Sequence, residues 1–203
     1  MDNNADEMVE IIPCLVNKVG QRNTDKYIVW IDTELTGLDI ETDTILEIAC
    51  IITDEKLNPV SKDFHVAIHQ PDEVLKNMND WCIKTHTETG LRQKCQSSKI
   101  SLREAEQLLL NFLKKYIAEK TCPLAGNTIY VDRIFLIKHM PLVNDYLHYR
   151  IIDVSTIKEL TRRWRPQDYP NVPTKQNSHQ ALSDIKESIE ELKYYKENIF
   201  LFA

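Results

Sequence analysis

The sequence predicts an α/β protein with a mixed sheet flanked by helices and folded as a single domain. Three apolar segments with strand character come first in the 203-residue chain, and helical patterns then alternate with short strand patterns. The apolar fraction of 42% is enough for one compact core. The sequence contains no internal repeat or low-complexity tract that would mark a second domain.

The first three strands are expected at residues 27–32, 43–54 and 61–70. The first contains the apolar run at 28–31, the second is rich in isoleucine, and the third alternates apolar with polar residues. A turn-like sequence, DEKLNP, separates the second strand from the third. These strands should therefore pair as an antiparallel meander.

Two helices are expected next, at residues 71–86 and 101–117. In the second, Ser101 and Glu104 have the spacing of a capping box. Apolar residues recur there at spacings of three and four, which predicts one buried stripe: Leu102, Ala105, Leu109, Phe112 and Tyr116.

The C-terminal half should hold two more strands, at 122–128 and 149–155, separated by a helix. That helix, at 131–147, is expected to break at Pro141. Further helices are expected at 155–164 and 178–199, with a proline-rich loop between them. Strands joined by helices run parallel, and sites in such sheets gather at the carboxyl ends of the strands.

The chain is interpreted as an N-terminal tail or extension, residues 1–26, followed by a folded domain at 27–203. The acidic start lacks the features of a secretory signal or an arginine-rich transit peptide, and no apolar run is long enough to span a membrane. Five scattered cysteines without a CxxC pair argue against a zinc finger or a disulfide framework and favour a reducing compartment. We therefore expect a soluble protein.

The net charge of −6 bears on possible nucleic-acid partners. A protein that grips a long nucleic acid usually has a basic surface. Any nucleic-acid substrate of this chain should therefore be short, or held by a small local basic site.

Four carboxylates are candidates for a metal site: Asp32, Glu34, Asp132 and Asp184. Asp32 and Glu34 follow the first apolar run two residues apart, so they point to the same face of a strand and repel each other unless a cation lies between them. Oxygen ligands favour Mg²⁺ or Mn²⁺, and two such ions about 4 Å apart suit displacement at phosphorus. By spacing alone, such a pair is more often an exposed polar rim.

His179 is the candidate general base for activating water. It precedes Asp184 by five residues, which corresponds to about 500° of helix, so both cannot point inward from one regular helix. His179 is therefore expected at the frayed start of the last helix or in the loop before it.

Four segments in order resemble the oligoribonuclease family of DEDD exonucleases, in the subclass with a catalytic histidine. They are IVWIDTELTGLDIETDTILEIACIITD, CPLAGNTIYVDRIFLIKHMP, LHYRIIDVSTIKELTRRW and SHQALSDIKESIEELKYY, and the resemblance covers about residues 27–200. It implies an RNase H-like fold, a site for two divalent cations and a homodimer. It also implies hydrolysis of very short RNAs, dinucleotides above all, from the 3′ end to nucleoside 5′-monophosphates.

Position by position, the resemblance assigns the four carboxylates as metal ligands and His179 as the general base. It makes Leu38 a wedge between two bases, and it lines the nucleotide pocket with Trp81 and His86. Taken alone, Trp81 would more often be a core residue. The remaining matched residues are a 5′-phosphate cap at Thr128, Arg150 and Ser155, and two residues supplied across the dimer interface, His148 and Tyr149.

The departures from the family pattern are small. Leu35 stands where Met is frequent, and Thr128 where Ser is common. Tyr130, beside Asp132, has no assigned role.

Three functions compete at this stage. The first is an exoribonuclease specific for tiny oligomers, the second a trimming or proofreading enzyme acting on longer DNA or RNA, and the third a catalytically silent RNA-binding module. The intact set of carboxylates with His179 argues against the third. The cytoplasm is the expected compartment, with the mitochondrion as the alternative, and activity on short DNA and the choice between Mg²⁺ and Mn²⁺ stay open.

Overall fold

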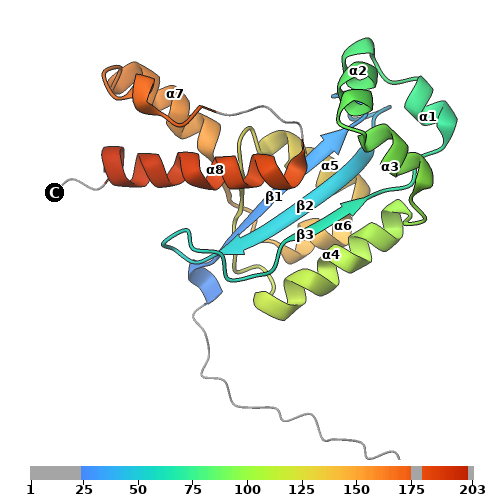
Figure 1. The fold of residues 1–203 in the computed structure, drawn as a ribbon. Helices are drawn as coiled ribbons and strands as arrows, with labels where there is room; N and C mark the ends of the chain where they lie inside the picture. Colours follow the sequence, from blue (N-terminus) through green and yellow to red (C-terminus); the bar gives the residue numbers. More distant parts are fainter. Residues whose placement is uncertain (1–23, 175–179, 201–203) are drawn as a thin grey trace, which may run out of the picture.

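A five-stranded mixed sheet lies at the centre of the computed structural model, which describes residues 24–174 and 180–200. The strands lie in the order β3-β2-β1-β4-β5, and Figure 1 shows β3, β2 and β1 side by side. Their bounds are β1 (Ile28–Leu35), β2 (Ile45–Thr53), β3 (Phe64–Ala67), β4 (Leu124–Gly126) and β5 (Ile151–Asp153). The first three pair as an antiparallel meander, and β4 and β5 run parallel to β1, so the mixed sheet is confirmed.

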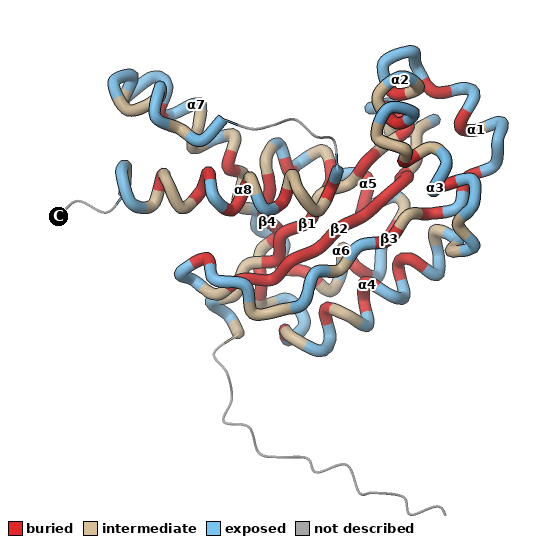
Figure 2. Tube along the Cα trace, viewed as in Figure 1, coloured by how far each residue is buried: buried red, intermediate tan, exposed pale blue. Residues whose placement is uncertain are grey.

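Helices cover both faces of the sheet. The helices α4 (Leu102–Tyr116), α5 (Tyr130–His139) and α6 (Pro141–Tyr146) pack on one face, and α8 (Ala181–Tyr195) with α7 (Val154–Trp164) packs on the other. The strand β2 is buried along its whole length, as is the short β4, whereas the edge strands β3 and β5 are more exposed (Figure 2). Alternation along β1 divides the core, because Val29 and Ile31 face α4 and Trp30 faces α8.

Two expected boundaries on the N-terminal side are wrong. The first strand does not stop at residue 32, because its pairing with β2 continues through Asp32↔Ala49 to Glu34↔Glu47. Both acids therefore lie inside β1. The third strand is shorter than 61–70 and keeps only Phe64–Ala67.

The single helix expected at 71–86 is two helices, α1 (Asp72–Lys76) and α2 (Asp80–Glu88). The break follows from Asn79, whose side chain accepts a hydrogen bond from the backbone N–H of Cys82 and so starts a new helix. A further helix, α3 (Leu91–Ser97), was not predicted; it begins after Gly90, which has a left-handed φ of 74°. These helices close one end of the sheet over a separate apolar cluster (Figure 1).

The C-terminal elements follow the expected order. The capping box at Ser101 and Glu104 is present, and the helix at 131–147 breaks at Met140 as the proline indicated. The final helix ends at Tyr195 and continues as a π turn over Lys196–Phe200. Residues 1–23 of the expected extension lie outside the described residues, and none of the described helices is long and apolar enough to cross a membrane.

The turn after β4 has little room for added atoms. A Cβ at Gly126 would lie 2.9 Å from Cδ1 of Ile129 and 3.1 Å from the carbonyl oxygen of Ile31. We expect Gly126→Ala to lower the free energy of unfolding by roughly 1–3 kcal/mol through overpacking. Urea unfolding measures this change.

The control is the same substitution in an Ile129→Val background, which lacks the atom closest to the new methyl group. The loss should be smaller there. An equal loss in both backgrounds would show that the contact with Ile129 is not the cause.

Candidate active site

Three carboxylates converge at the carboxyl end of β1. Asp32 and Glu34 alternate with Thr33, so they share the face of β1 that Trp30 presents to α8. Asp184 comes from the first turn of α8, where its Oδ2 accepts the backbone N–H of Gln180 at 3.0 Å. One oxygen atom from each of the three carboxylates lies within 4.8 Å of the others. This cluster could hold a metal ion.

Like charges are crowded in this cluster. Glu34 is only 8% exposed. Its pKa is raised to about 8, mainly by burial and in addition by the charges of Asp184, Glu47 and Asp132. Glu47, on β2, pairs with Glu34 across the two strands. It is also buried, and its Oε1 lies 2.7 Å from Nε2 of His65. A divalent cation would offset this repulsion, and the all-oxygen donor set fits a hard cation.

Asp132 reaches the edge of β1 from the first turn of α5. Its Oδ1 accepts hydrogen bonds from the backbone N–H of Thr33 at 2.9 Å and from Thr33 Oγ1 at 2.6 Å. That backbone group is accessible because β4 pairs with β1 only at Val29 and Trp30. Burial raises the pKa of Asp132 to about 6, while the bonds from Thr33 act in the opposite direction.

Asp132 is therefore placed differently from the other three acids. It is not one of the three whose oxygens lie within 4.8 Å of one another, yet its charge acts on Glu34. The role of Thr33 was not foreseen from the sequence. The only sign of this role in the sequence is that Thr33 lies between Asp32 and Glu34 on a strand. Its side chain therefore points to the face of the sheet opposite to theirs.

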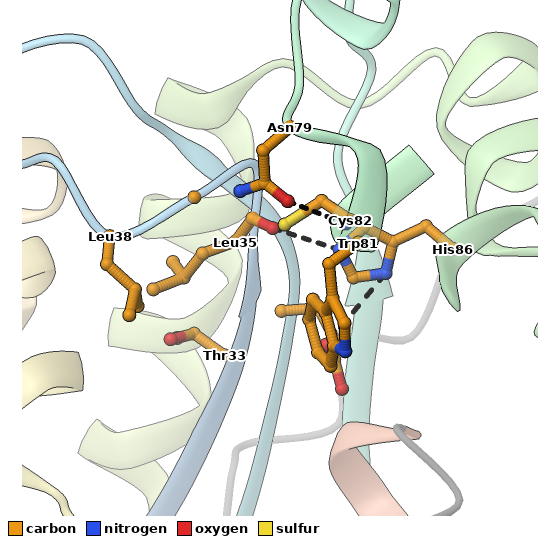
Figure 3. A pocket seen from close by; sticks show the side chains of 9 residues that line it. Thr33, Leu35, Leu38, Asn79, Trp81, Cys82 and His86 are labelled. Carbon is orange, nitrogen blue, oxygen red and sulfur yellow. Dashed lines mark hydrogen bonds and ion pairs between the residues drawn. The ribbon is translucent and has the colours of Figure 1, made fainter. Parts of the chain in front are cut away.

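A cavity of about 410 Å³ adjoins the carboxylates. Leu38, after β1, and Trp81, on α2, stand on either side of it (Figure 3). They are 78% and 58% exposed, so Trp81 is not a core residue. Sequence reasoning found Leu38, Trp81 and His86 but missed other residues of the lining: Thr33, Leu35, Gly37, Asn79 and Cys82.

His86 supports the wall of this cavity from inside. The ring is buried, its Nε2 lies 2.9 Å from the carbonyl oxygen of Leu35, and its Nδ1 is 4.0 Å from Oε2 of Glu34 (Figure 3). Because a carbonyl only accepts, Nε2 carries the proton. His86 thus ties α2 to the end of β1.

A second polar group forms where β4 and β5 end. Thr128 has a left-handed φ of 54°, and its backbone N–H donates to Asp153 Oδ1 and to Ser155 Oγ, both at 3.0 Å. Asp153 Oδ1 also accepts the backbone N–H of Ser155 and starts α7. Thr128 and Ser155 are thus in direct contact, with 3.1 Å between Thr128 Oγ1 and Ser155 Oγ, and both bind Asp153, which the sequence analysis did not name.

Arg150 is not brought to this group. Arg150 lies just before β5, whereas Ser155 lies just after the strand. Within the described residues, Arg150 makes no hydrogen bond to Thr128 or Ser155. Its guanidinium lies over the Tyr149 ring, which stacks on His148 with 4.4 Å between ring centroids. His179, the expected general base, lies outside the described residues.

The RNase H-like sheet and the acid cluster at the end of β1 define a nuclease domain of the exonuclease class. The family model described as Exonuclease matches residues 29–192. The chain belongs to the oligoribonuclease family of the DEDD exonuclease superfamily, because its relatives are similar over most of their length.

Three relatives illustrate this similarity. A probable oligoribonuclease of Drosophila melanogaster is 54% identical over 87% of this chain and 83% of its own. The oligoribonuclease of Vibrio parahaemolyticus is 50% identical over 87% of this chain and 97% of its own. The human relative, named mitochondrial oligoribonuclease, is 51% identical over 85% of this chain and 73% of its own.

Solved structures of exonuclease I share the fold. One from Methylocaldum szegediense superposes with a TM-score of 0.64 at 19% identity, and another exonuclease I with 0.67 at 15%. Each match covers 85% of this chain but only 41% of the other protein. At this identity the likeness supports the fold alone.

The raised pKa of Glu34 predicts how stability depends on pH. In the metal-free protein, the pKa of Glu34 is about 8 in the folded state, so the carboxyl keeps its proton until the pH approaches that value. In the unfolded chain the same carboxyl loses its proton near its ordinary pKa of 4.5. Stability should therefore fall as the pH rises from about 4.5 to about 8. In Glu34→Gln this loss disappears, so the variant should be more stable than the wild type by roughly 2–4 kcal/mol at pH 8 and by less than about 1 kcal/mol at pH 5.

Urea unfolding in the presence of a chelator measures this difference. Glu55→Gln, at an exposed turn, is the matched control and should show no pH-dependent gain. A gain at Glu34 that does not change with pH would mean that burial does not keep this carboxyl protonated.

Proposed function

We propose that this protein is a 3′-to-5′ exoribonuclease that hydrolyses short oligoribonucleotides, dinucleotides above all, to nucleoside 5′-monophosphates. The observation that carries the proposal is that Glu34 belongs both to the carboxylate cluster and to the lining of the adjoining cavity. A nucleotide held in that cavity would have its phosphodiester beside the acids. The oligoribonuclease relatives support the same substrate class.

The proposed metal site takes two divalent cations, Mg²⁺ or Mn²⁺, held by Asp32, Glu34, Asp132 and Asp184. Carboxylate oxygens from β1 and α8 fit a hard cation, and Asp132 is fixed on one side by Thr33. When bound, such cations would activate water and neutralise charge at the scissile phosphodiester. His179 is proposed as the general base that takes the proton from that water.

The proposed substrate contacts divide into two groups. Leu38 would wedge between the bases, Trp81 offers an exposed ring for stacking, and His86 completes this pocket. Thr128 and Ser155 would hold the terminal 5′ phosphate. Arg150, whose fork suits a phosphate, would have to leave the Tyr149 ring to join them. These contacts belong to one exonuclease domain, residues 27–203, with residues 1–26 as an extension.

A homodimer is proposed because α5 exposes an apolar stripe. Tyr130, Ile134 and Ile137 follow one another at helical spacing, and all are exposed. Exposed apolar patches of this kind mark association surfaces. Leu142, Tyr149 and Ile151, later in the chain, are further exposed apolar side chains. We propose that a second copy bound to this surface contributes its own His148 and Tyr149 to the first copy's site.

The compartment is proposed from the relatives and the sequence together. The cytoplasm is the expectation from the cysteine pattern. The mouse and human relatives are named mitochondrial, which supports the mitochondrion as the alternative.

Turnover as a function of RNA length tests the proposed activity. With Mn²⁺, cleavage of a 5′-phosphorylated dinucleotide should far exceed cleavage of RNAs of about seven or about 20 nucleotides. Asp132→Asn should lower the dinucleotide rate by at least about 100-fold, since it removes one carboxylate proposed to hold the cations that neutralise charge at the scissile phosphodiester. Asp25→Asn, at an exposed position, is the matched control and should be fully active.

Equal rates on all lengths would favour the trimming enzyme over the dinucleotidase. Absence of mononucleotide release from any substrate would favour the silent binding module. Retained turnover in Asp132→Asn would remove Asp132 from the metal site.

The dimer surface predicts the effect of a charge on α5. Ile137→Glu should shift the protein to a monomer, because a carboxylate cannot be buried unpaired in an apolar interface. If Tyr149 acts in trans, activity should fall with it. Sedimentation measures the first effect and dinucleotide turnover the second.

Leu108→Glu on α4, at another exposed apolar residue, serves as the control. It should change neither the oligomeric state nor the dinucleotide turnover. A fully active Ile137→Glu monomer would contradict the contribution of Tyr149 across the interface.

A further inference from the structure

Glu191, on α8, is a fully buried carboxylate outside the acid cluster. Three donors from three elements surround it: Asn127 Nδ2 at 3.1 Å, Tyr195 OH at 2.9 Å and Lys158 Nζ at 3.4 Å. Burying a charge is unfavourable unless its partners are well placed. This group therefore joins α8 to α7 and to the turn after β4 in one defined arrangement.

The turn that Glu191 reaches carries a strained residue. Asn127 immediately precedes Thr128, whose left-handed φ of 54° is unfavourable for a β-branched side chain. Such conformations persist only where the surroundings hold them. Asp153 and Ser155 hold the Thr128 backbone from one side, and Glu191 holds the Asn127 side chain from the other.

The carboxylate of Glu191 determines which end of the Asn127 side-chain amide faces it. A carboxylate only accepts hydrogen bonds, so the nitrogen of the Asn127 amide faces Glu191. A neutral side chain of another shape at position 191 would remove this constraint. The turn could then rotate toward a less strained backbone at Thr128.

One face of α8 serves both parts of the site. Glu191 follows Asp184 by seven residues, which is about 20° short of two full turns, so both side chains project from the same side of the helix. The helix that supplies an acid to the cluster at its first turn thus fixes the Thr128 turn two turns later.

We propose that Glu191 is a positioning residue that holds the Asn127–Thr128 turn in the shape required to bind the terminal 5′ phosphate. This inference rests on the proposed function of Thr128 and Ser155 as the phosphate contact. Glu191 does not touch the substrate and acts through Asn127.

Steady-state kinetics of the full chain on two substrates test this role. The substrates are one dinucleotide with a 5′ phosphate and the same dinucleotide with a 5′ hydroxyl. In Glu191→Leu, kcat/KM for the phosphorylated substrate should fall about tenfold through KM, with less than about a twofold change for the hydroxyl substrate. Glu191→Gln keeps an oxygen for Asn127 and should retain most of the wild-type preference.

Tyr195→Phe is the matched control. It removes a hydrogen bond to Glu191 without touching Asn127, so it should lower the unfolding temperature and leave the substrate preference unchanged. If Glu191→Leu does not fold, Asn127→Ala removes the same link from the turn and should lose the preference in the same way.

Parallel losses on both substrates, or an unchanged preference in a folded Glu191→Leu or Asn127→Ala variant, would overturn the proposal. A wild-type protein that shows no preference for the 5′ phosphate would instead contradict the phosphate contact itself, and the role of Glu191 would fall with it. The wild-type measurement therefore separates failure of the proposed function from failure of this inference.

Discussion

Crowding of like charges at the end of β1 is the constraint on which the rest of the structure depends. Asp32 and Glu34 cannot turn away from each other, because a strand places alternate side chains on one face. Glu34 is buried, and its pKa is raised to about 8 by burial and by the neighbouring acids. The sheet and α8 hold this unfavourable arrangement, in which a cation entering the cluster would find carboxylate oxygens already close together.

The order of the strands explains why these groups meet. Because β4 is short, the edge of β1 beyond Trp30 is open, and Asp132 takes the backbone group of Thr33 that a longer β4 would have bonded. The same early end of β4 creates the turn at Thr128, beside the start of α7. One topological feature, the short parallel strand β4, therefore allows both the contact between Asp132 and Thr33 and the neighbouring polar group.

Much of this arrangement could be predicted from the sequence, and the remainder depends on tertiary contacts. The strand period placed Asp32 and Glu34 on one face, the sequence offered Asp132 and Asp184 as further candidate acids, and the resemblance supplied Leu38 and Trp81. Thr33 was missed because nothing in its pattern shows where β4 ends. The separation of Arg150 from Ser155 was missed because the motif gives residue types but not which end of β5 each occupies. Glu191 reads in the sequence as one more acid on a solvated helix, and only packing shows it buried.

The acidic charge of the chain fits a short substrate better than a long one. Affinity for long strands comes from many phosphate contacts, and a chain with net charge −6 has no general basic surface to provide them. In the proposed function, the exposed ring of Trp81 and the side chain of Leu38 would instead provide apolar contact, and base stacking contributes roughly 1–3 kcal/mol per base whatever the base. With one terminal phosphate contact, as proposed, such a site would gain little binding energy from further nucleotides. A site that recognises stacked bases and one chain end would therefore favour short substrates and accept any base sequence. Both properties suit an enzyme that removes short RNA fragments of mixed sequence.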